Sequence, residues 1–331
     1  MTENDIVLDP FDEYDEFDVW DLPGGARRQG KPPVTRRPKR SQEEVVAELT
    51  EAEGLEAGFN ITYKPSRYEK VWLLSSLRGF YEQQQITDVL AQVKGGKEAS
   101  VYRCAAHPST GMDLLAAKVY RPRQFRNLRN DKMYREGRAI LTSDGRPVKE
   151  TDSRIMRAVG KKTHFGVQVA HTSWLMYEFT TLGRLFRAGA AVPEPIAAGE
   201  NAILMTYYGD DVRAAPTLSE VGLPRDEAAA LFQEALRNID LLLQHGMIHG
   251  DLSAYNILYW EGRIILIDFP QVTSSEGNSN AYTILHRDIT RVCEYFAAQG
   301  VPNDPDALTR DLWAKYGVEQ EVVADMAWLN E

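Results

Sequence analysis

Residues 248–258 read Ile-His-Gly-Asp-Leu-Ser-Ala-Tyr-Asn-Ile-Leu, and twelve residues after Asn256 the apolar run 264–267 ends at Asp268. An Asp, an Asn five residues later and a second Asp at the end of a strand form an arrangement that phosphoryl transfer from a nucleotide uses. Asp251 would accept or orient the proton of the attacking hydroxyl. Asn256 and Asp268 would hold Mg²⁺ on the phosphates. The pattern therefore predicts chemistry on ATP.

The tripeptide His-Gly-Asp is a weak signal by itself, because any tripeptide occurs by chance. The apolar pair Met247-Ile248 before it, the five-residue interval from Asp251 to Asn256 and the strand after it make the signal much more specific. A structural alternative for Asp268 is the capping of a turn or helix.

Upstream, short strands are expected at 89–93, 100–104 and 113–120, and Lys118 lies near the end of the third. A lysine on a strand is usually a solvated surface residue. Together with the Asp-Asn-Asp pattern, Lys118 is expected to bridge the α- and β-phosphates of ATP and to pair with a carboxylate from the next helix. Glu178 is the preferred partner, and Glu194 in a Pro-Glu-Pro segment is the alternative.

Residues 95–100 read Gly-Gly-Lys-Glu-Ala-Ser and connect the first two strands. They match neither GxGxxG nor a Walker loop. Gly95 and Gly96 permit a close approach of the backbone to phosphate, and Lys97 and the hydroxyl of Ser100 could reach it. The alternative is a plain hairpin turn with polar residues.

The rest of the chain favours an α+β, two-lobed, protein-kinase-like fold. One or two helices are expected in 66–92, with Val71, Leu74, Leu77 and Phe80 on one stripe. A helix at 171–188 and strands at 192–199 and 202–206 complete a five-stranded N-lobe sheet with one helix. The reduced, mainly helical C-lobe is expected to contain helices at 226–245, 281–299, 305–316 and about 319–329, and strands at 257–259 and 264–267.

Four segments are predicted from these patterns. They are a disordered acidic-then-basic tail at 1–40, a helical extension at 41–88 with a helix at 41–57, a kinase N-lobe at 89–208, and a truncated C-lobe at 209–331. The N-lobe carries a basic insertion at 121–163, in which thirteen Lys or Arg stand against five acids. Such an insertion is either a mobile loop or a docking surface.

The tail is strongly patterned in charge. Residues 1–21 contain nine acids and no Lys or Arg, whereas residues 26–40 contain seven Lys or Arg and no acid. Blocks of this kind bury too little apolar surface to become ordered. The basic half could contact nucleic-acid phosphates, or the acidic half could mask a basic surface of the same chain. A solvated tail that aids solubility is the simpler alternative.

Composition indicates a cytoplasmic enzyme. The chain has 331 residues, 43% of them hydrophobic, and no apolar run long enough to span a membrane. It has two distant cysteines, so neither a disulfide framework nor a thiolate metal site is indicated. The N-terminus lacks the features of a secretory signal.

Two departures from ordinary protein kinases affect the substrate. Phe269 is followed by Pro270 rather than Gly, so the hinge of a switching Asp-Phe-Gly segment is missing. Sixty-three residues follow Asp268, and none of them reads Ala-Pro-Glu. A protein substrate would therefore be bound by a surface other than a full peptide-binding lobe.

Taken together, these residues resemble the RIO family of atypical serine/threonine protein kinases. The resemblance covers about residues 66–316. Its motifs are Gly96–Tyr102, Ala117–Arg121, Glu178 before 192–195, Ile248–Asn256, Ile267–Gln271 and Arg287-Asp288-Ile289.

The resemblance implies a truncated two-lobed kinase that uses ATP and Mg²⁺, with Mn²⁺ as an alternative metal. It implies Asp251 as proton acceptor, with Lys118 and Asp268 also catalytic, and Asn256 and Asp268 as metal ligands. The implied ATP-binding residues are Gly96, Lys97, Glu98, Ser100, Val101, Lys118, Glu178, Met205 and Tyr207. It further implies that Asp268 can become phosphorylated, which would make the protein an ATPase switch. Relatives work in maturation of the small ribosomal subunit, and the basic segments 26–40 and 121–163 would suit a partner containing RNA.

Two other classes of function remain open. A small-molecule kinase of the aminoglycoside or choline type also uses His-Gly-Asp-x-x-x-x-Asn followed by Ile-Asp-Phe, although the Gly-Lys-Glu-Ala-Ser-Val-Tyr loop and the short C-terminus argue against it. A scaffold without turnover is the other alternative, and the presence of Lys118, Asp251, Asn256 and Asp268 argues against that.

Overall fold

The computed structural model describes residues 59, 61–96, 98–121, 138–149, 151–161 and 163–316. The predicted tail, the helix expected at 41–57 and the helix expected near 319–329 lie outside these residues. Lys97 and a large part of the basic insertion also lie outside them.

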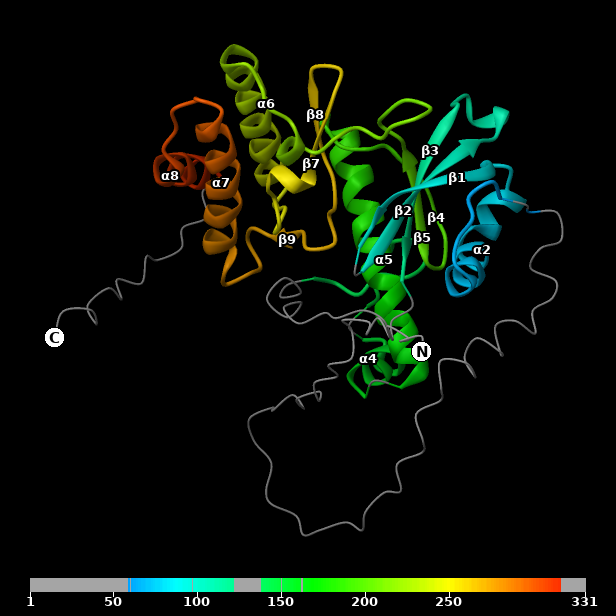
Figure 1. Ribbon diagram of the computed structural model, residues 1–331. Helices are drawn as coiled ribbons and strands as arrows, with labels where there is room; N and C mark the ends of the chain where they lie inside the picture. The colour runs from blue at the N-terminus through cyan, green and yellow to red at the C-terminus, as the bar shows by residue number, and fades with distance from the viewer. Residues whose placement is uncertain are drawn as a thin grey trace, which may run out of the picture. The chain divides into compact units, whose positions relative to one another are not determined.

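Five strands form one antiparallel sheet in the order β1-β2-β3-β5-β4, which confirms the predicted N-lobe sheet (Figure 1). The strands are β1 (Ile86–Gly95), β2 (Ala99–Ala106), β3 (Leu114–Tyr120), β4 (Pro195–Ala198) and β5 (Ala202–Thr206). A short 3₁₀ turn, η1 (Pro108–Thr110), lies between β2 and β3. Since successive side chains of a strand point to opposite faces, this sheet has two different buried faces.

One face of the sheet is covered by α2 (Arg67–Glu82). The predicted apolar stripe of this helix is buried at Leu74, Leu77 and Phe80, in one cluster with Leu115, Ala117 and Val119 of β3 and with residues of the other strands. The helix begins where the Ser66 hydroxyl accepts a hydrogen bond from the backbone N–H of Glu69. The helical prediction for 66–92 is wrong at its C-terminal end, because β1 begins at Ile86.

The other face is covered by α5 (His164–Arg187). Ala116 and Tyr120, which alternate with the α2-facing residues of β3, are buried here with Trp174 and Leu175 of α5. The helix begins seven residues before the predicted 171, since Thr163 caps its N-terminus by accepting from the Gly166 N–H at 3.1 Å.

Helix α4 (Ser153–Gly160) was not predicted. Its N-terminus is capped by Asp152, whose Oδ1 accepts from the Ile155 N–H at 3.2 Å. It packs closely on the start of α5, since a Cβ at Gly166 would lie 1.9 Å from the carbonyl oxygen of Ala158. None of its residues is fully buried, but Ile155, Ala158 and Val159 are half-buried at helical spacing. This apolar face is too short to be recognised within the basic segment.

The second half of the chain, drawn from green to red in Figure 1, is mainly helical around one apolar core. Its helices are α6 (Arg225–Gln244), α7 (Ala281–Ala298) and α8 (Pro305–Lys315), with the 3₁₀ turns η3 (Leu218–Glu220) and η4 (Ala254–Asn256). Its strands form two small antiparallel pairs, β6 (Met247–Ile248) with β9 (Thr273–Ser274) and β7 (Ile257–Trp260) with β8 (Arg263–Leu266). The helices α6, α7 and α8 and the strands β7 and β8 agree with the predictions for 226–245, 281–299, 305–316, 257–259 and 264–267, whereas β6 and β9 were not predicted.

The sheet with its helices and the mainly helical half together form the predicted two-lobed, kinase-like α+β fold. Among the helices that the structure describes, none combines the length and the apolar character needed to cross a membrane.

Candidate active site

Lys118 lies on the face of the sheet that is covered by α5, because it alternates with Leu115, Ala117 and Val119, which face α2. Its side chain is 10% exposed, and Nζ lies 2.6 Å from Glu178 Oε1 and 2.6 Å from Asp268 Oδ1. A buried ammonium with two carboxylates is satisfied in both charge and hydrogen bonding. The solvated-surface alternative for Lys118 is therefore excluded.

Glu178 is 1% exposed and accepts from three different donors. Besides Lys118, these are the hydroxyl of Tyr120 to Oε2 and the backbone N–H of Phe269 to Oε1 at 3.3 Å. The acidic partner of Lys118 is thus Glu178 and not Glu194. The Glu178 carboxylate therefore connects α5, on which it lies, with β3 and with the segment after β8 through hydrogen bonds.

Asp268 follows β8 with a φ of 71°, a left-handed conformation that non-glycine residues rarely adopt. Desolvation acts to raise the pKa of its carboxyl, but the Lys118 ammonium overrides this effect and lowers the pKa below the usual value. Desolvation likewise acts to lower the pKa of Lys118, and the carboxylates of Asp268 and Glu178 raise it overall. Each group therefore holds the other in its charged form.

The turn that leads into Asp251 is fixed by its backbone and by His249. Gly250 has a φ of 86°, and a Cβ there would lie 2.3 Å from the carbonyl oxygen of Gln271. His249 is 2% exposed, and desolvation lowers its pKa, which favours a neutral ring. Nε2 then donates to the Ile267 carbonyl at 3.1 Å, and Nδ1 accepts from the Asp251 N–H at 3.3 Å. His249 thus links the Asp251 turn to the segment that carries Asp268.

Asn256 lies at the end of η4 and turns its amide nitrogen toward Asp251. Nδ2 donates to the backbone carbonyl of Asp251 at 2.8 Å and lies 3.3 Å from Asp251 Oδ2. This orientation leaves the amide oxygen Oδ1 as the group that can ligate a metal.

The predicted metal ligands fit Mg²⁺ in chemistry. Asn256 and Asp268 supply oxygen donors, and Mg²⁺ is usually held by one or two protein oxygens together with waters and phosphates. Within the described residues, no group of three or more His, Cys, Asp or Glu side chains could hold a metal ion.

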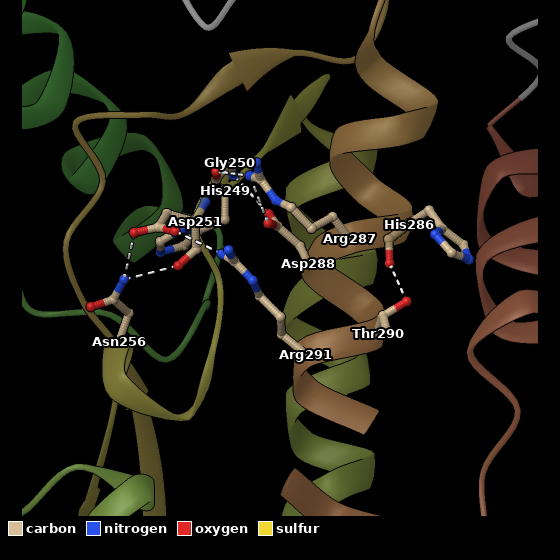
Figure 2. A network of polar contacts seen from close by, with 9 residues as sticks. All are labelled: His249, Gly250, Asp251, Asn256, His286, Arg287, Asp288, Thr290 and Arg291. Carbon is tan, nitrogen blue, oxygen red and sulfur yellow. Dashed lines mark hydrogen bonds and ion pairs between the residues drawn. The ribbon is translucent and has the colours of Figure 1, made fainter. Parts of the chain in front are cut away.

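Helix α7 holds the Asp251 turn through three side chains that the sequence analysis did not assign to the site (Figure 2). Arg287 donates to the Gly250 carbonyl, Asp288 Oδ2 accepts from the Gly250 N–H at 2.7 Å, and Arg291 Nη1 lies 2.8 Å from Asp251 Oδ1. Desolvation raises the pKa of Asp288 to about 7, while Arg287 and the Gly250 N–H oppose that shift. For Arg287 and Asp288 the available signal was the Arg287-Asp288-Ile289 motif, to which the sequence analysis gave no role, whereas no local pattern pointed to Arg291.

The residues predicted to bind ATP are divided between the two faces of the sheet. Val101 pairs with Lys118 across β2 and β3, and Ala116 pairs with Met205 across β3 and β5, so Val101 and Met205 share the Lys118 face. Tyr207, just after β5, packs against the same apolar cluster.

Ser100 differs, because it pairs with Val119 and therefore lies on the α2 face, 1% exposed. The structure does not bring its hydroxyl to Lys118. Gly96 and Glu98 lie in the β1–β2 connection, where a Cβ at Gly96 would lie 2.7 Å from the Ala99 carbonyl oxygen. A side chain at position 96 would therefore force this turn to shift.

A sheet lysine paired with a helix glutamate, beside an Asp-Asn turn and a further Asp, defines the kinase-like class of phosphotransferase folds. The RIO domain model matches residues 101–308, which is more than half of the chain, so the chain belongs to the RIO domain family. The match includes Lys118, Glu178, Asp251, Asn256 and Asp268.

Two relatives carry the same family name. The chain is 30% identical over 219 residues to the RIO-type serine/threonine-protein kinase Rio1 of Haloferax volcanii. The matched region covers 65% of this chain and 66% of the relative. It is 29% identical over 227 residues to the serine/threonine-protein kinase RIO1 of Chaetomium thermophilum. This match covers 65% of this chain and 40% of that protein. The chain thus spans just under two thirds of the archaeal relative and less than half of the fungal one.

Proposed function

We propose that this protein is an ATP- and Mg²⁺-dependent phosphotransferase, a RIO-type serine/threonine kinase that can also act as an ATPase switch. The observation that carries the proposal is the contact of Lys118 with both Glu178 and Asp268, at 2.6 Å each. In this proposal Lys118 neutralises part of the phosphate charge, and Asp268 beside it would hold the metal that neutralises the rest. The names of the relatives support the same reaction.

In the proposed kinase reaction, Asp251 accepts the proton of a serine or threonine hydroxyl through its carboxylate. The hydroxyl oxygen forms a bond to the γ-phosphorus, the bond from that phosphorus to the β–γ bridging oxygen breaks, and ADP leaves with the electron pair. Mg²⁺, when bound through Asn256 and Asp268, neutralises charge on the phosphates. Lys118 holds the α- and β-phosphates, and Glu178 keeps the Lys118 ammonium in place.

In the ATPase alternative, a carboxylate oxygen of Asp268 takes the place of the hydroxyl oxygen and forms an acyl phosphate as ADP leaves. Water then hydrolyses the acyl phosphate to restore Asp268 and release inorganic phosphate. Asp268 is 43% exposed on its side chain, so it is accessible to a phosphoryl group and to water.

The two routes are distinguished by incubating the full chain with Mg²⁺ and γ-labelled ATP. Label that hydroxylamine removes, and that is missing in Asp268→Asn, would indicate the acyl phosphate. Label on Ser or Thr that resists hydroxylamine and disappears in Asp251→Asn would indicate the kinase reaction. If the wild-type protein showed no label and released no phosphate, the proposed function would be contradicted.

We further propose RNA, or a particle that contains RNA, as a partner and the cytoplasm as the location. Supporting the partner, the described part of the insertion exposes Arg146, Lys149, Arg154 and Arg157. Supporting the location, Cys104 and Cys293 are both buried free thiols, as a reducing compartment allows. Deleting residues 1–40 should weaken salt-sensitive RNA binding and leave ATP turnover intact; unchanged binding to RNA would remove the tail from the proposal.

A further inference from the structure

Arg291 makes a direct ion pair with the residue proposed to accept the proton. Its Nη1 lies 2.8 Å from Asp251 Oδ1, and both side chains are 40% exposed. The two residues are 40 positions apart and come from different elements, α7 and the turn after β6. In Figure 2 the side chain of Arg291 extends from the helix toward the Asp251 carboxylate.

Side chains of α7 also hold the backbone of Gly250, the residue before Asp251. The Gly250 N–H donates to Asp288, and the Gly250 carbonyl accepts from Arg287, so α7 fixes both polar groups of the preceding residue. Arg287 and Arg291 lie one helical turn apart and therefore on the same face of α7. Two contacts thus fix the backbone of the turn, and the third fixes the carboxylate.

The two oxygens of the Asp251 carboxylate are not equivalent. Oδ1 accepts a charge-assisted bond from Arg291 at 2.8 Å, whereas Oδ2 has the long 3.3 Å contact with Asn256 Nδ2. Short charge-assisted bonds are roughly twice as strong as neutral ones. Oδ2 therefore keeps the greater capacity to accept a further hydrogen bond.

We propose that Arg291 is a positioning residue that holds Oδ1 of Asp251 and so assigns Oδ2 to the proton of the attacking hydroxyl. This inference rests on the proposed function, because it assumes that Asp251 serves phosphoryl transfer. The guanidinium acts through Asp251, whose Oδ1 it holds by the 2.8 Å charge-assisted bond from Nη1. Loss of that orientation lowers the rate of the chemical step without removing the ATP site.

The test compares Arg291→Ala and Arg291→Lys with Arg237→Ala in the full chain. Arg237 is a matched control, since it is an arginine on α6 that donates to the Gly189 carbonyl at 3.3 Å. Transfer or release of label from γ-labelled ATP is measured as kcat and KM, each with and without added guanidinium ion. Thermal unfolding checks that each variant is folded.

We expect Arg291→Ala to lower kcat by about tenfold to a hundredfold, with KM for ATP within about twofold of wild type. Guanidinium ion should restore part of that rate, Arg291→Lys should lie in between, and Arg237→Ala should match wild type with and without guanidinium. A structural role alone would not give rescue by a small cation.

Two other outcomes separate the claims. If wild type turns over ATP and both Arg291 variants match Arg237→Ala, or if guanidinium gives no rescue of a folded Arg291→Ala, the role of Arg291 is overturned and the proposed function stands. If wild type neither transfers nor releases phosphate, the proposed function is overturned, and the role of Arg291 falls with it.

Discussion

Lys118 Nζ lies 2.6 Å from Asp268 Oδ1, although 150 residues separate the two in the chain. The contact joins a strand of the N-terminal sheet to the segment after β8 in the other half of the molecule. Glu178 completes the cluster from α5. Because both carboxylates share one ammonium, release of Asp268 would leave Lys118 paired with Glu178 and would make one of its N–H donors available to a phosphate oxygen.

The first prediction concerns the buried pair itself. Lys118→Met should destabilise the protein by roughly 3–5 kcal/mol, because Glu178 is 1% exposed and would lose its ammonium partner. Adding Glu178→Gln to that variant should restore much of the stability, since the remaining carboxamide is uncharged. Denaturant midpoints measure both effects, and ATP turnover should be absent in both variants.

An unchanged midpoint in Lys118→Met would mean that the pair is not formed in solution. ATP turnover in the stabilised double variant would mean that Lys118 is structural and has no part in catalysis.

A second prediction concerns Tyr120, whose hydroxyl donates to Glu178 Oε2. Tyr120→Phe should cost about 1.5–3 kcal/mol for the lost bond to a charged group, and it should lower kcat/KM for ATP by about tenfold because Glu178 loses one of its fixed donors. Tyr102→Phe is the matched control, since Tyr102 is also fully buried and donates to Glu69 Oε1 at 2.6 Å. Equilibrium unfolding and steady-state kinetics are measured on both variants.

The control variant should lose comparable stability and keep wild-type kinetics. Equal kinetic losses in the two variants would show that Tyr120 acts through general stability and not through Glu178.

Local patterns were sufficient for much of the fold and for the core of the site. Strand β5 runs over Ala202–Thr206 as predicted, because an apolar run of this length between turn residues is too short for a typical helix. Lys118 and Glu178 were paired in advance since each lies on an element with clear periodicity. The contact itself is observed, and the catalytic roles stay predictions.

What the sequence could not show depends on register and on long-range contacts. Ser100 lies on the α2 face because it pairs with Val119, and a loop pattern alone does not determine that register. Arg291 reaches Asp251 through the packing of α7, which no local spacing encodes. Helix α4 was missed because it is only eight residues long, so the apolar face formed by Ile155, Ala158 and Val159 spans too short a window to stand out within a basic segment.

A third prediction follows from Asp288, whose pKa is raised from 3.8 to about 7. Between about pH 4 and pH 7 the unfolded chain loses this proton while the folded protein keeps it, so the free energy of unfolding falls as pH rises through that window. At about 1.4 kcal/mol for each unit of pKa, the loss amounts to a few kcal/mol at most. Asp288→Asn cannot titrate and should remove this component, which denaturant midpoints at pH 4 to 8 would show.

The control for that experiment is Asp211→Asn, a change of the same chemistry at an exposed position. The pH profile of this control should follow wild type. If the profile of Asp288→Asn runs parallel to wild type as well, the carboxyl of Asp288 titrates near its ordinary value in the folded protein.

The last prediction separates backbone strain from steric conflict at the Asp251 turn. Gly250 and Gly262 both have positive φ, 86° and 74°, but a Cβ at 250 would lie 2.3 Å from the Gln271 carbonyl oxygen, whereas a Cβ at 262 meets nothing within 4 Å. Gly262→Ala should therefore cost only about 1 kcal/mol of backbone strain and keep ATP turnover. Gly250→Ala should add the clash, displace Asp251 from Arg291 and abolish turnover. Equal thermal midpoints and equal turnover in the two variants would show that the turn adapts and that α7 does not fix the position of Asp251.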